Sequence, residues 1–164
     1  MKGTSAVLAA AGLGILLQSP AWAASGAQPA SGTFLITSST VDSARVADGN
    51  TILVIALTGN ATGTFDGRFT ETDHEVIHPD GSVTLLGTGT QFGTLGTCGT
   101  GSVRYVTEQQ GTLSALSGRF IDQAASTSTP IKIHSVDRLT VNTVTGEATY
   151  TGTIGAPKNH PLRA

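Results

Sequence analysis

Alternation of apolar and polar residues, broken by turn signals at short intervals, is the feature that most constrains this chain. Between residues 32 and 155 we find such alternating segments and no convincing stretch of 3.6-residue helical periodicity. Pro79-Asp80-Gly81 stands between two of these segments and is typical turn chemistry. The sequence therefore predicts an all-β domain in which residues 62–78 and 82–95 form a hairpin.

The same signals divide the domain into eight expected strands. These are residues 33–41, 51–59, 62–78, 82–95, 101–110, 113–124, 131–141 and 147–154. Most are joined by short turns, which indicates an antiparallel meander. Because an open meander would leave two long unpaired edges, we expect a single eight-stranded antiparallel β-barrel, whose lumen can hold side chains or one small ligand.

The ends of the chain carry targeting and linker signals. A positive charge, an apolar run at residues 6–17 and a small-x-small tripeptide ending at Ala23 are typical of a cleaved signal peptide. We therefore expect an exported protein, either secreted or periplasmic. The expected divisions are a signal peptide at 1–23, a flexible linker at 24–31, the β-barrel domain at 32–155 and a disordered tail at 156–164.

Composition excludes several classes of partner. Charged residues are 12% of the chain, the net charge is −2 and there is no basic stripe, so we expect no nucleic-acid binding. Aromatic residues are 5% and form no interfacial girdles, so we expect no membrane-spanning barrel. Cys98 is the single cysteine, so no intrachain disulfide can form. A homo-oligomer is left open.

The segment His74-Glu75-Val76-Ile77-His78 matches the H-E-x-x-H signature of zinc proteases. In a helix the two histidines could reach one zinc ion, whereas in a strand they lie about 13 Å apart. Two β-branched residues and the proline that follows favour a strand. A zinc metalloprotease is therefore a minor hypothesis, and we expect no metal site and no cofactor.

The central hairpin suggests where polar chemistry could lie. If Gly81 is left-handed in the turn, His78 faces Ser82, and Glu71, Asp73 and Glu75 share one face. Two glycines and a leucine stand opposite these acids. Such a pairing is expected where acidic side chains point into a largely apolar lumen. Such buried acids would be protonated or bridged to Arg104 or Arg119, or else they lie at a solvated strand end.

Glu71 and Asp73 are therefore the candidate catalytic residues. The candidate ligand contacts are Phe65, Phe69, Leu85, Tyr105 and Phe120. For the four aromatic residues, packing in the core or lumen is the plainer interpretation.

Four short runs resemble the allene oxide cyclase-like barrel families: GTF at 32–34, TGTFDGRFTE at 62–71, IHPDGS at 77–82 and LSGRF at 116–120. The resemblance covers most of residues 32–154. It implies an eight-stranded antiparallel barrel with an apolar cavity. It also implies membership of a superfamily in which plant allene oxide cyclases, dirigent proteins and some bacterial cyclases steer reactive intermediates to ring-closed or coupled products.

These observations lead to three hypotheses besides the protease. The first is a secreted barrel that holds a small apolar ligand in its lumen without chemistry. The second is a cofactor-free cyclase or isomerase in which Glu71 stabilises developing positive charge. The third is a barrel whose lumen is packed shut and whose role is structural or an interaction.

Overall fold

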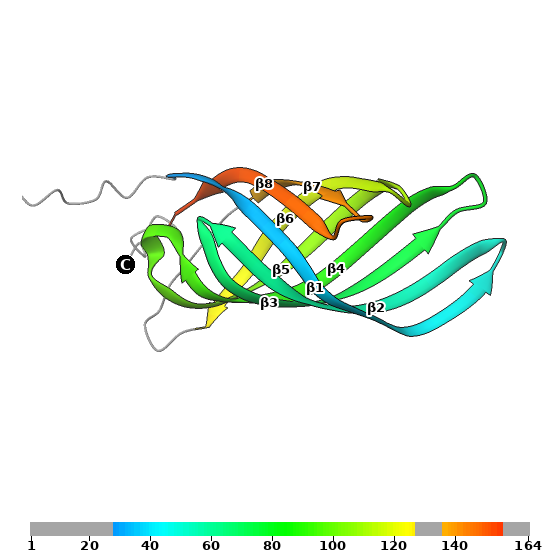
Figure 1. The fold of residues 1–164 in the computed structure, drawn as a ribbon, viewed down its shortest axis with the longest axis horizontal. Helices are drawn as coiled ribbons and strands as arrows, with labels where there is room; N and C mark the ends of the chain where they lie inside the picture. Colours follow the sequence, from blue (N-terminus) through cyan, green and yellow to red (C-terminus); the bar gives the residue numbers. More distant parts are fainter. Residues whose placement is uncertain (1–27, 127–135, 156–164) are drawn as a thin grey trace, which may run out of the picture.

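The computed structural model describes residues 28–126 and 136–155, which form a closed antiparallel β-barrel. Each strand pairs with the next, and the last closes onto the first (Figure 1). The predicted all-β class and the single eight-stranded barrel are therefore confirmed. The strands are β1 (Gln28–Ala47), β2 (Asn50–Gly63), β3 (Phe65–Ile77), β4 (Ser82–Leu95), β5 (Thr100–Thr112), β6 (Ala115–Ser126), β7 (Val136–Asn142) and β8 (Glu147–Ile154), with a short 3-10 turn at Gly96–Cys98.

The predicted strand bounds hold best where turn chemistry is strongest. The strands β4 and β8 match the expected residues 82–95 and 147–154. The linker prediction is wrong for residues 28–31, because they belong to β1 and pair with β8 from Gln28↔Ile154 onward. Tertiary pairing thus orders a segment whose composition is typical of a linker. The expected signal peptide, the rest of the linker and the tail lie outside the described residues, as do residues 127–135.

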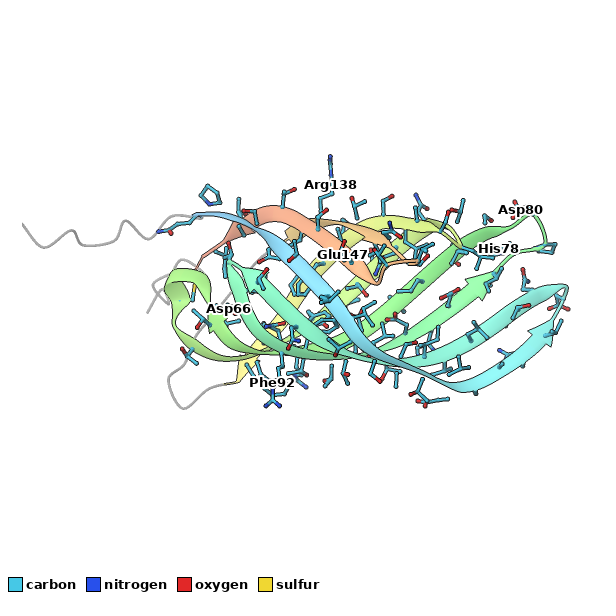
Figure 2. The ribbon with its side chains drawn as sticks, in the orientation of Figure 1. Asp66, His78, Asp80, Phe92, Arg138 and Glu147 are labelled. Atoms are coloured by element: carbon cyan, nitrogen blue, oxygen red, sulfur yellow. The ribbon has the colours of Figure 1, made fainter. Side chains whose placement is uncertain are left out.

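The β3–β4 hairpin has the register that its turn predicts. The His78 amide donates to the Ser82 carbonyl at 2.8 Å, and Gly81 has a positive φ of 84°. Asp80 accepts hydrogen bonds from both the amide and the hydroxyl of Ser82, at the tip seen in Figure 2. Behind this turn, Asp73 pairs with Gly87. The predicted register of the hairpin, which places Glu71, Asp73 and Glu75 on one face, is therefore confirmed.

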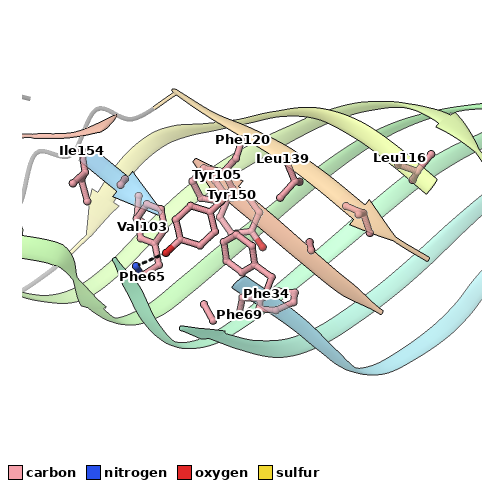
Figure 3. Close-up of a cluster of buried hydrophobic side chains, with 14 of the residues drawn as sticks. Phe34, Phe65, Phe69, Val103, Tyr105, Leu116, Phe120, Leu139, Tyr150 and Ile154 are labelled. Carbon is pink, nitrogen blue, oxygen red and sulfur yellow. Dashed lines mark hydrogen bonds between the residues drawn. The ribbon is translucent and has the colours of Figure 1, made fainter. Parts of the chain in front are cut away.

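Six aromatic side chains pack together in one part of the lumen (Figure 3): Phe34, Phe65, Phe69, Tyr105, Phe120 and Tyr150. Neighbouring rings lie 4.5 to 6.5 Å apart between centroids. The Tyr150 hydroxyl accepts from the Phe65 amide at 2.8 Å and donates to the Thr62 carbonyl at 3.2 Å. The buried phenol is thus satisfied, and the cluster fills this part of the barrel.

Candidate ligand cavity

Another part of the lumen is a cavity of about 460 Å³. This volume is in the range of pockets that bind small molecules. The aromatic cluster forms part of its lining through Phe34, Phe69, Tyr105 and Phe120, and the cavity extends to residues 37–39 of β1 and to the β7–β8 turn at residues 143–146. Between them the lining is mainly aliphatic: Ile36, Ile55, Leu57, Leu85, Leu116, Leu139, Val141 and Ala148.

One polar cluster interrupts this apolar lining. The Glu71 carboxylate of β3 accepts hydrogen bonds from two hydroxyls of β5: Thr107 donates to Oε1, and Tyr105 donates to Oε2 at 3.1 Å. Asp73 lies two residues farther along β3 and is 4% exposed. The cluster is therefore built from inward-facing side chains of β3 and β5.

Glycines on β4 allow these side chains to meet. The strand β4 lies between β3 and β5, so side chains from the two outer strands must cross a gap of about 10 Å. A Cβ atom at Gly87 would collide with oxygen atoms of Glu71, Thr107 and Asp73, and one at Gly89 would collide with the Tyr105 ring. Because Gly87 and Gly89 have no side chains, the carboxyl groups and the Tyr105 ring can lie over β4.

The environment of the cluster favours proton retention. Burial raises the pKa of Asp73 from 3.8 to about 9, with further contributions from the charge of Glu71, a hydrogen bond with Glu71 and the charge of Glu75. Burial also raises the pKa of Glu75, and burial with the nearby Glu71 charge raises the pKa of Tyr105 well above its usual value. This raised pKa favours the protonated form of Asp73 at neutral pH.

The expected bridge from these acids to an arginine is wrong. Arg119 lies on the outside of the barrel, where its Nη2 pairs with Glu108 Oε2 at 2.7 Å. Arg104 is exposed as well. Both arginines occupy the outward phase of their strands, so the pleat directs them away from the lumen. Of the two expected ways to bury these acids, only protonation applies, and it is clearest at Asp73.

The structure brings most of the predicted site residues to the cavity. Glu71, Asp73, Phe69, Leu85, Tyr105 and Phe120 all line it. Phe65 does not, because it is fully buried in the aromatic cluster. Sequence reasoning missed Thr107 and Phe34. Thr107 could have been found from the alternation along β5, because it shares the face of Tyr105.

The H-E-x-x-H segment lies in β3 and the turn that follows, not in a helix. His74 is exposed on the outer face, whereas the His78 ring contacts Asn50 Oδ1 at 3.0 Å and Thr84 Oγ1 at 3.4 Å. Within residues 28–126 and 136–155 no group of three or more potential ligands is placed to hold a metal ion. The helical arrangement that a zinc protease requires is therefore not formed.

No family model matches the chain, and no curated protein matches it. The part of the chain that the structure describes contains no helix of the length and apolarity that crossing a membrane requires. Functional conclusions therefore rest on the cavity itself.

Proposed function

We propose that this protein is an exported β-barrel that binds a small, largely apolar molecule in its lumen. The observation that carries the proposal is the cavity of about 460 Å³, with a mostly aliphatic and aromatic lining and one buried polar cluster. Binding sites for small molecules combine such a lining with a few polar groups that orient the ligand. A lumen packed shut would have left no such space. Export is proposed from the signal-peptide pattern at residues 1–23.

A cofactor-free cyclase or isomerase is the second candidate function. It is favoured by the protonated Asp73 beside Glu71, because a carboxyl group that keeps its proton at neutral pH can act as a general acid. This candidate agrees with the resemblance to allene oxide cyclase-like barrels, in which intermediates are steered within a cavity. Turnover of a bound ligand, recognised by its conversion to an isomer of the same mass, would distinguish this function from simple binding.

The binding proposal can be tested with a neutral apolar fluorescent dye such as Nile red. Leu85 lines the cavity, whereas its neighbour Leu86 is 49% exposed on the outer face. We expect Leu85→Trp to reduce dye binding by filling the cavity, and Leu86→Trp to leave it unchanged. Leu139→Trp should fill the same cavity from β7. It replaces Leu85→Trp in the test if circular dichroism shows that Leu85→Trp does not fold.

Equal dye binding by wild-type protein and both cavity-filling variants would contradict the proposal. Mass spectrometry of small molecules that co-purify with the native protein gives an independent measurement. A stoichiometric apolar compound in the wild type that is absent from Leu85→Trp is the expected result.

A further inference from the structure

The lumen holds three acidic side chains and no matching cation among the described residues. Glu71, Asp73 and Glu75 all line the cavity. Carboxyls placed side by side repel one another when ionised, so a shared proton or a nearby cation has to accompany them. In residues 28–126 and 136–155 every arginine is exposed, and there is no lysine. A buried charge of this kind is costly unless a partner of opposite sign reaches it.

Asp73 also keeps a hydrogen-bonding atom that no described group uses. Its side chain is 4% exposed, and its Oδ1 atom is buried without a hydrogen-bond partner. Glu71, by contrast, is held by Thr107 and Tyr105 from β5. Glu71 is thus fixed by hydroxyls on one side, while Asp73, which also lines the cavity, keeps one oxygen without a partner beside Gly87.

Resting on the proposed binding function, we infer that the ligand is an apolar monoamine whose ammonium group is held by Glu71 and Asp73. An ammonium group carries hydrogen-bond donors and a positive charge, so it can donate to these carboxyls and balance their charge at the same time. Phe69 and Phe120 line the same cavity and add apolar surface for the hydrocarbon part of the ligand. The hydrocarbon body lies against the aliphatic lining of Ile55, Leu57, Leu116 and Val141.

A neutral ligand would meet only part of this need. An alcohol can donate one hydrogen bond to a carboxyl, but it brings no positive charge to the acids of this apolar cavity. Glu75, farther along β3 and half-buried, adds a third acid to the same lining. Charges of one sign along a low-dielectric cavity attract ligands of the other sign. The lumen therefore discriminates in favour of amines over isosteric alcohols.

The test compares nonylamine with nonan-1-ol, which share a chain length and differ in the charged group. Competition against the neutral dye at neutral pH gives both affinities in the wild-type protein. We expect nonylamine to bind at least about tenfold more tightly, the difference that about 1.4 kcal/mol produces. In the double variant Glu71→Gln, Asp73→Asn we expect this preference to fall to near onefold. Glu108→Gln removes an acid from the outside of the barrel and should keep the wild-type preference.

The outcomes separate this inference from the function on which it rests. If the dye binds and nonan-1-ol competes as well as nonylamine, the amine inference is overturned while lumenal binding stands. An unchanged amine preference in the double variant would overturn it as well. If no dye and neither ligand binds the wild type, the proposed function itself fails. The wild-type comparison needs no variant, so it decides even if the double variant does not fold.

Discussion

Replacing Asp73 by Asn should stabilise the barrel at neutral pH, because it removes a group that folding forces to keep a proton. With a pKa of about 9 in the folded protein and 3.8 as its ordinary value, Asp73 is ionised in the unfolded chain but protonated in the barrel at pH 7. At about 1.36 kcal/mol per pH unit, the interval from 3.8 to 7 corresponds to an upper bound of ~4 kcal/mol. Relaxation around Glu71 reduces this, so we expect a gain of ~2 to 4 kcal/mol.

The pH dependence of this gain has a definite sign. Below the ordinary value of 3.8 Asp73 is protonated in both the folded and the unfolded state, so the wild-type protein and the Asp73→Asn variant should differ little in stability. As the pH rises toward 9, the unfolded wild-type chain releases a proton that the folded one retains, and wild-type stability falls relative to the variant. Urea denaturation followed by far-ultraviolet circular dichroism at several pH values measures this difference.

Two results would refute the reasoning. One is an Asp73→Asn variant less stable than wild type at pH 7, and the other is a difference that does not change with pH. Asp80→Asn is the matched control on the same hairpin. Hydrogen bonds from Ser82 lower the pKa of Asp80, so its contribution to stability is present above its ordinary pKa and is lost as the pH falls. The exposed Asp80 should therefore show the opposite sign.

Four further changes test the carboxyl site, the aromatic cluster, the hairpin turn and the strand assignment in that order. Gly87→Ala should displace the carboxyls and weaken any ligand bound to them, which dye competition would measure; unchanged ligand affinity would contradict the close approach over β4. Tyr150→Phe should cost about 1 to 3 kcal/mol in urea denaturation, since the buried Phe65 amide loses its acceptor. Gly81→Val should destabilise the hairpin by backbone strain alone, because no atom lies within 4 Å of its Cβ position; Gly81→Asn should cost less. His74→Ala should change stability by no more than about 0.5 kcal/mol and leave zinc content, measured by atomic emission, unchanged.

The sequence by itself determined the class of fold and the central hairpin. Pro79-Asp80-Gly81 specifies a turn, and that turn sets which residues of β3 and β4 oppose one another. Because strand side chains alternate with a period of two, this register also placed Glu71 and Asp73 on one face with the glycines of β4. The pairing of β3 with β4 is local in sequence, because a single short turn joins the two strands.

Only the tertiary structure decided what meets inside the lumen. The hydroxyls of Tyr105 and Thr107 reach Glu71 across β4, and Gln28–Leu35 find their partners in β8, more than a hundred residues away. Neither relation follows from alternation, which assigns a face but not a neighbour two strands away. Closure curves the sheet until inward side chains of separate strands converge, and that curvature brings the Tyr105 and Thr107 hydroxyls to Glu71.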